Sequence, residues 1–163
     1  MKKYFLWFFA LIALIGADQL TKWWAVIALK GNDGISIINN VFRLMYLENH
    51  GAAFGIMQNK RWLLLIITVV ILAALSFLLI KIPHEKKYVP IQWIFIALEA
   101  GAVGNMIDRI INGYVVDFFY FELIDFPIFN VADCYVVIAA IAAIVLLLFY
   151  YKDEDLEKIK NGK

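Results

Sequence analysis

Little in this 163-residue chain points to disulfide, metal or nucleic-acid chemistry. Its single cysteine, Cys134, cannot form a disulfide within the chain, and it offers no cysteine-based metal cluster. The two histidines, His50 and His84, lie far apart and lack the spacing of metal ligands. The formal net charge of +1 excludes a strongly basic nucleic-acid binder. Function must therefore rest on other residue types.

The chain is instead rich in apolar sequence. It is 64% hydrophobic with a mean hydropathy of +0.78, whereas ordinary globular domains are about 45–50% apolar. Four segments, residues 4–29, 62–80, 88–107 and 134–151, each reach the roughly 20 apolar residues that a transmembrane helix needs. We predict an all-α membrane protein with four transmembrane helices in one domain over residues 1–163.

The first segment has a second interpretation. Lys2 and Lys3 followed by an apolar run are typical of a cleavable signal peptide, with cleavage after Ala17. The apolar character resumes at Trp23, however, and three further apolar segments follow. These features favour an uncleaved first helix.

Lysine and arginine in short loops predict the orientation. Lysines precede the first segment, fill the link at residues 81–87 and recur in the tail after residue 151. With four spans these regions share one side, which we predict to be the cytoplasm. The outer side then holds residues 30–61 and 108–133. The first outer loop is rich in β-branched and aromatic residues between Ile35 and Leu47, which predicts a small sheet at the outer membrane surface.

Five of the fourteen carboxylates lie between residues 104 and 133. Carboxylates near lipid are costly and point to function. Asp133 opens the fourth helix, and Asp117 lies in the loop before it. If the chain brings them together, one carboxylate can activate a water and the other can protonate a leaving group, as in an aspartic protease. On spacing alone, a helix N-cap role for Asp133 and a solvated position for Asp117 are favoured.

Other polar residues lie beside these two. Asn105 and Asn130 could orient carboxylates by hydrogen bonds. Arg109 is the only cation of the stretch, and it could pair with Asp108 or bind a substrate carbonyl or a lipid phosphate.

Two further groups of residues have both a structural and a functional interpretation. The small residues of 49–55 would let an extended peptide approach, or would simply form a tight turn before the second helix. Asp18 and Lys22 are spaced i, i+4, which predicts a buried ion pair that is structural or anchors a lipid headgroup.

In their order along the chain, these motifs resemble those of lipoprotein signal peptidases, the bacterial type II signal peptidases, which are aspartic endopeptidases. The resemblance covers essentially the whole chain. The five motifs are Asp18-Gln19-Leu20-Thr21-Lys22, Asn49-x-Gly51-Ala52-Ala53-Phe54, Gly104-Asn105-x-x-Asp108-Arg109, Val115-Val116-Asp117-Phe118 and Phe129-Asn130-x-Ala132-Asp133.

The resemblance implies a reaction and a site. Members of the family remove the signal peptide of a prolipoprotein by cleaving before a cysteine that carries diacylglycerol. By motif, Asp117 and Asp133 are the catalytic pair. The residues implied to support the site or touch substrate are Asp18, Lys22, Asn49, Gly51, Ala52, Phe54, Asn105, Asp108, Arg109 and Asn130.

The resemblance also implies a setting. The expected fold is four transmembrane helices with a small extracytoplasmic β-cradle from the first loop and a short outer helix. The expected location is the bacterial cytoplasmic membrane, with both termini cytoplasmic and the active site at the outer face. The expected partners are prolipoproteins and membrane lipids, with peptide antibiotics of the globomycin type as inhibitors. No metal or organic cofactor is expected.

Two positions depart from the family pattern. Cys134 stands where a serine usually follows the second aspartate, and Glu99 lies where an apolar or small residue is usual. Glu99 could face a cavity or pair with another helix.

The main alternative function is a small four-helix transporter or channel whose charge path includes Asp18, Lys22 and Glu99. A non-catalytic membrane scaffold is a second alternative, but it leaves the cluster of asparagines and aspartates unexplained.

Overall fold

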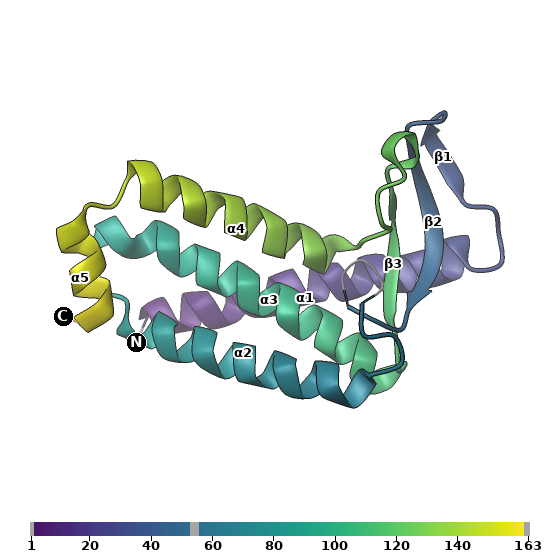
Figure 1. Cartoon of the computed structure of the whole chain (residues 1–163). Coiled ribbons are helices and arrows are strands. Elements are labelled where there is room, and N and C mark those ends of the chain that lie inside the picture. The colour runs from purple at the N-terminus through teal and green to yellow at the C-terminus, as the bar shows by residue number, and fades with distance from the viewer. Residues whose placement is uncertain (1, 53–55, 162–163) are drawn as a thin grey trace.

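Four long helices run side by side in this computed structural model, which describes residues 2–52 and 56–161 (Figure 1). A short fifth helix lies at the end of the bundle where both chain termini are found (Figure 1). The helices are α1 (Lys2–Leu29), α2 (Arg61–Lys81), α3 (Val89–Ile111), α4 (Val131–Phe149) and α5 (Asp153–Asn161).

Within the described residues, α1, α2 and α4 are long and apolar enough to cross a membrane. Few of their residues are buried inside the protein, so most of their apolar side chains face outward, where lipid can cover them. These helices make the chain an integral membrane protein. The third helix, α3, is less apolar and packs against the other three.

Two glycines of α3 allow the helices to approach closely. A Cβ atom on Gly101 would lie 2.6 Å from the backbone oxygen of Ala132 in α4. A Cβ atom on Gly104 would lie 2.5 Å from a carboxylate oxygen of Asp18 in α1. Small residues at these positions therefore determine how near α1 and α4 can come to α3.

A three-stranded antiparallel sheet lies at the end of the bundle opposite the termini, roughly across the helix axes (Figure 1). Its order is β1 (Ile35–Ile38), β2 (Phe42–Asn49) and β3 (Val115–Tyr120). The prediction of strands in the first outer loop is confirmed. The prediction that the sheet comes from that loop alone is wrong, because β3 belongs to the second outer loop and pairs with β2.

The helix boundaries also differ from those predicted. The third helix continues to Ile111, and α4 begins at Val131, so the second outer loop is shorter than expected. That loop contains a single 3-10 turn, η3 (Glu122–Ile124). The tail, for which no helix was predicted, forms α5, which is tied to the link before α3 by an ion pair between Asp155 and Lys87.

The close approach at Gly101 yields a stability prediction. We expect Gly101→Ala to lower the free energy of unfolding by about 1–3 kcal/mol, because the new methyl group meets backbone that cannot move freely. Gly16→Ala is the matched control, since a Cβ atom there has no neighbour within 4 Å. Thermal unfolding of the two purified variants in detergent would test this. Equal melting temperatures would contradict it.

Candidate active site

Asp117 and Asp133 line the same cavity of about 1000 Å³ at the end of the bundle that carries the sheet. Asp117 projects from the middle of β3, and its residue is 1% exposed. Asp133 lies in the first turn of α4 and is half-buried. The expectation that Asp117 is a solvated loop carboxylate is therefore wrong, because the strand buries it.

One residue contacts both carboxylates. The side-chain nitrogen of Asn130 donates to Oδ1 of Asp117 at 2.6 Å. The backbone N–H of Asn130 donates to Oδ2 of Asp133 at 3.1 Å. Asn130 is also the N-cap of α4, since its side-chain oxygen accepts from the backbone N–H of Asp133. The helix start and the two acids thus share a single hydrogen-bonded unit.

Two further asparagines bind the remaining carboxylate oxygens. Asn49 in β2 donates to Oδ2 of Asp117 at 2.9 Å. Asn105 in α3 donates to Oδ1 of Asp133 at 2.8 Å. All four oxygens of the pair therefore have a donor, and each side chain has a defined orientation.

The surroundings favour a proton on this pair at neutral pH. Burial and, second to it, the charge of nearby Asp133 together raise the pKa of Asp117 to about 7. Hydrogen bonds from Asn49 and Asn130 act in the opposite direction, because they stabilise the ionised form. Near pH 7 the pair can therefore hold one ionised and one protonated carboxyl group.

A buried lysine, Lys22, binds the asparagine that donates to Asp133. Nζ of Lys22 in α1 lies 3.0 Å from Oδ2 of Asp18 and 3.1 Å from Oδ2 of Asp108. It also donates to Oδ1 of Asn105 at 2.8 Å. The predicted ion pair between Asp18 and Lys22 is thus confirmed. Because Lys22 holds the oxygen of the Asn105 amide, the amide nitrogen is left facing Asp133.

Asp108 and Arg109 do not form the pair that the sequence suggested. Asp108 points into the bundle, where it contacts Lys22 and accepts from the backbone N–H of Val116 at 3.0 Å. Arg109 lines the cavity and donates to the backbone oxygen of Gly51 at 2.8 Å. Adjacent residues on a helix point in different directions. Asp108 therefore faces the interior of the bundle, whereas Arg109 faces the cavity.

The helix-one motif contributes one residue that sequence reasoning did not single out. Gln19 donates to Oδ1 of Asp108 at 3.0 Å and to the backbone oxygen of Gly104 at 3.2 Å. Beside it, Oδ1 of Asp18 accepts from the backbone N–H of Ala132 at 2.9 Å. The signal for Gln19 was its place directly after Asp18 within the motif.

The turn after β2 closes one side of the cavity. Gly51 is buried, and its N–H donates to Oδ1 of Asn49 at 2.9 Å. A Cβ atom at Gly51 would lie 2.7 Å from the backbone oxygen of Ile56, so no other residue fits without movement. Ala52 lines the cavity, and its N–H donates to the same Ile56 oxygen. Phe54 lies outside the described residues.

Glu99 and Cys134, the two departures from the family pattern, lie at different sites in the protein. Oε1 of Glu99 accepts from the hydroxyl of Ser76 on α2 at 2.8 Å, so this carboxyl pairs with another helix. Cys134 lines the cavity next to Asp133 as a free, half-buried thiol.

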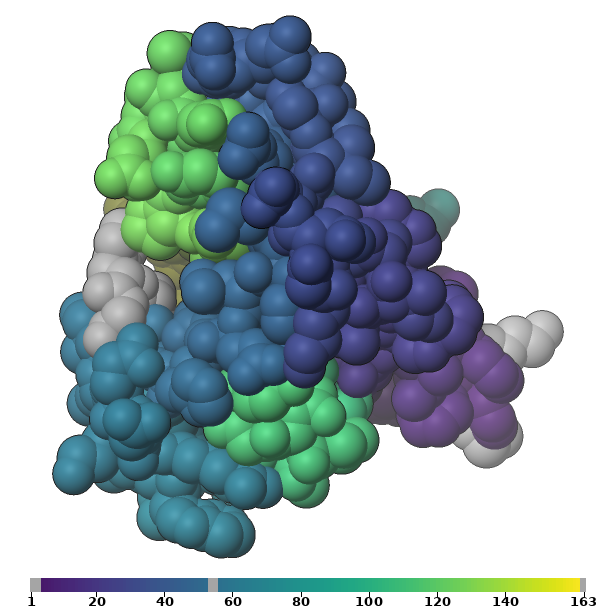
Figure 2. All heavy atoms as spheres, turned by 90° about the vertical axis from the view of Figure 1, so that its right-hand side faces the viewer, coloured from purple at the N-terminus to yellow at the C-terminus, as the bar shows by residue number. Residues whose placement is uncertain are grey.

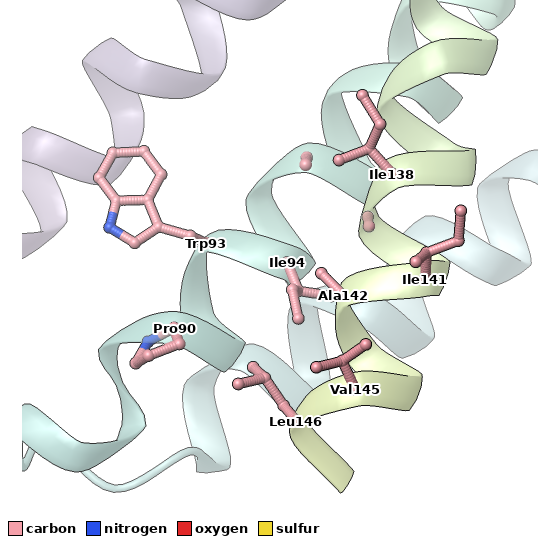
Figure 3. A pocket seen from close by; sticks show the side chains of 10 residues that line it. Pro90, Trp93, Ile94, Ile138, Ile141, Ala142, Val145 and Leu146 are labelled. Carbon is pink, nitrogen blue, oxygen red and sulfur yellow. The ribbon is translucent and has the colours of Figure 1, made fainter. Parts of the chain in front are cut away.

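A second hollow, of about 560 Å³, lies between α3 and α4 (Figure 3). Its walls include Trp93, Ile94 and Val145, and no lining residue carries a carboxyl, amide or hydroxyl group (Figure 3). Of these two cavities, only the one that Asp117 and Asp133 line therefore carries groups able to perform acid–base chemistry.

Comparison with known proteins assigns the family. The family model described as Signal peptidase (SPase) II matches residues 10–149. The chain belongs to the signal peptidase II family. It is 41% identical over 146 residues to the lipoprotein signal peptidase of Streptococcus thermophilus (strain CNRZ 1066), covering 90% of this chain and 92% of the relative. The lipoprotein signal peptidase of Clostridioides difficile (strain 630) is also 41% identical, over 89% of this chain and 96% of its own.

Solved structures agree with this assignment. A bacterial membrane enzyme solved by the in meso method at 2.3 Å resolution superposes with a TM-score of 0.77 at 33% identity. The match covers 91% of this chain and 92% of that chain. The resemblance seen in the five motifs is therefore confirmed, and the chain is a membrane peptidase. The alternative of a transporter or channel is not supported.

The enclosed lysine yields a second stability prediction. We expect Lys22→Met to destabilise the protein by roughly 3–5 kcal/mol, because it leaves two buried carboxylates without their cation. Lys30→Met is the control, since Lys30 pairs with Glu48 at an exposed site and its loss should change little. Unfolding of both variants in detergent measures the difference. Similar melting temperatures for the two would argue against a central role for Lys22.

Proposed function

We propose that this peptidase is an aspartic endopeptidase that removes the signal peptide from prolipoproteins, cleaving before a diacylglyceryl-modified cysteine. One observation carries the catalytic assignment. Asp117 and Asp133 come from a strand and a helix, yet they line one cavity and share Asn130 as a hydrogen-bond partner. The names of the relatives support the substrate class.

In the proposed mechanism the pair begins with one proton. The ionised carboxylate accepts a proton from a water held between the two acids. The water oxygen attacks the scissile carbonyl carbon, and the other carboxyl protonates the leaving nitrogen as the C–N bond breaks. Because the two acids titrate as a coupled pair, the starting proton belongs to the pair rather than to one residue. Asn49, Asn105 and Asn130 hold both carboxyl groups in place during these transfers.

The walls of the cavity suit a lipidated peptide. Polar groups from Asn105 and Arg109 lie on the same cavity as apolar residues of α2 and α4, among them Leu64, Ile67 and Val137. In our proposal the peptide lies against the polar wall, and the diacylglyceryl group lies against the apolar one. Antibiotics of the globomycin type would compete for the same space.

The arrangement of the chain supports the proposed orientation. We propose that α3 spans the membrane with the other three helices, since its 23 residues extend about 34 Å at 1.5 Å per residue. Both termini lie at one end of the bundle, and the sheet lies at the other (Figure 1). With the lysine-rich regions in the cytoplasm, the cavity opens at the outer face of the bacterial cytoplasmic membrane.

The catalytic assignment predicts the effect of two substitutions. We expect Asp117→Asn and Asp133→Asn each to abolish cleavage of a diacylglyceryl-modified peptide by purified protein, because neither amide can exchange the required proton. Asp33→Asn, at an exposed turn, is the control and should retain activity. Near-normal turnover in either of the first two variants, with the fold intact, would refute the pair.

The pKa of Asp117 predicts the pH profile. Activity should fall as pH rises through about 7, because the pair then loses its last proton, and it should fall again in acid when both groups are protonated.

A variant should shift the alkaline side of this profile. Asn49→Ala removes a hydrogen bond that stabilises ionised Asp117, so the pKa of Asp117 rises and the alkaline limb of the profile moves to higher pH. The measurement is kcat/KM against pH. A limb that stays in place or moves to lower pH would contradict this prediction.

A further inference from the structure

One end of the sheet exposes large apolar side chains that belong to no spanning helix. We call this group the apolar tip; its members are Ile37, Ile38, Phe121, Leu123 and Ile124. Their exposed fractions are 55%, 55%, 41%, 69% and 68%. Exposed apolar residues are expected on α1, α2 and α4, which lipid surrounds. These five lie elsewhere: Ile37 and Ile38 on β1, Phe121 directly before η3, and Leu123 and Ile124 in η3.

Contacts between strands hold the tip in shape. Ile38 pairs with Phe42 across the turn between β1 and β2. The backbone N–H of Leu123 donates to the oxygen of Val41 in that turn at 3.4 Å. The rings of Phe42 and Phe121 lie 4.9 Å apart. The end of β1 and the η3 turn therefore form one surface, although more than 80 residues separate them in the chain.

The position of the apolar tip relative to α4 places it along the surface of the bilayer. The sheet crosses the helix axes, and the end with η3 and the β1–β2 turn extends past the near end of α4 (Figure 1). Seen from the outer end, the same parts of the chain form the top of the molecule (Figure 2). Since α4 crosses the bilayer, a projection across its outer end runs along the bilayer surface.

Two polar contacts lie beside the tip. Nε of Arg43 lies 3.7 Å from Oε2 of Glu122, which is close enough for an ion pair but too far for a hydrogen bond, and both atoms are buried without a hydrogen-bond partner. Asp125 accepts from the hydroxyl of Tyr120 at 2.7 Å. The ion pair and the hydrogen bond lower the cost of bringing this surface against lipid headgroups.

We propose that the apolar tip inserts into the interfacial region of the outer leaflet, with phospholipid as its partner. Contiguous exposed apolar groups mark interaction surfaces, and lipid already surrounds the neighbouring helices. Phe121 of the tip and the nearby Phe126 also line the active-site cavity. Insertion therefore places the cavity mouth at the level of the lipid headgroups. On the proposed function, a lipidated substrate then reaches the acids without its acyl chains leaving the bilayer.

Site-directed labelling tests the insertion independently of catalysis. In a Cys134→Ser background, Leu123→Cys is labelled with an environment-sensitive fluorophore, and the full chain is reconstituted into phosphatidylcholine–phosphatidylglycerol vesicles. Asp33→Cys, at an exposed turn between α1 and β1, is the matched control. We expect nitroxide lipids labelled near the headgroup to quench the label at 123 about fivefold more than the label at 33. Iodide in the water should show the opposite order.

Two results would overturn the proposal. Equal quenching of both labels by iodide would place the tip in water. Protection of the label at 123 from both iodide and nitroxide lipids would show that protein covers it, as in contact with a second copy of the chain.

An activity measurement tests the link to the cavity. Leu123→Asp with Ile124→Asp should lower kcat/KM about tenfold for a diacylglyceryl-modified peptide embedded in vesicles. In detergent micelles, where no bilayer surface exists, the same variant should cleave as the parent protein does. Leu123→Phe with Ile124→Leu keeps the surface apolar and should retain activity in both. Full activity of the aspartate variant in vesicles would refute the link to the cavity, whereas inactivity of the parent protein would refute the proposed function and leave the quenching result standing.

Discussion

The ion pairs of the Lys22 ammonium group with the carboxylates of Asp18 and Asp108 are the interaction on which the rest of the structure depends. These groups tie α1 to α3 inside the bundle. Asp18 also binds the backbone of Ala132 at the start of α4, and Asp108 binds the backbone of Val116 in β3. Charges this deep are stable only when paired and hydrogen-bonded, so the elements that supply the partners are held at fixed positions.

The proposed catalytic pair is built on this cluster. Lys22 holds the oxygen of Asn105, whose nitrogen binds Asp133. The strand that Asp108 anchors carries Asp117. The same polar residues therefore contribute to stability and to the site, and Asp133 shows this most directly. The prediction that Asp133 is the N-cap of α4 is wrong, because Asn130 occupies that position. The Asp133 carboxylate instead completes the capping box from the third helical position while lining the cavity, so it can serve both the helix start and the site.

The sheet shows where prediction from sequence was weakest. The first outer loop has the β-branched and aromatic residues of strands, and its strands were predicted. In β3, four successive residues from Val115 to Phe118 are buried, so the alternation that marks a half-exposed strand is absent. The partner strand β2 lies far earlier in the chain, and its pairing is a long-range contact that local sequence does not reveal. Asp117 was therefore placed in a solvated loop rather than in a buried strand.

The sequence by itself determined the apolar segments that become helices and the polar motifs that lie at their ends, because span length and hydropathy are local properties. It also determined the pairing of Asp18 with Lys22, since residues four apart on a helix share a face. Only the tertiary structure decided that Asp108 binds Lys22 rather than its neighbour Arg109. Only the tertiary structure brought Asp117 and Asp133 to one cavity, because the packing of a strand against a helix start depends on contacts between distant segments.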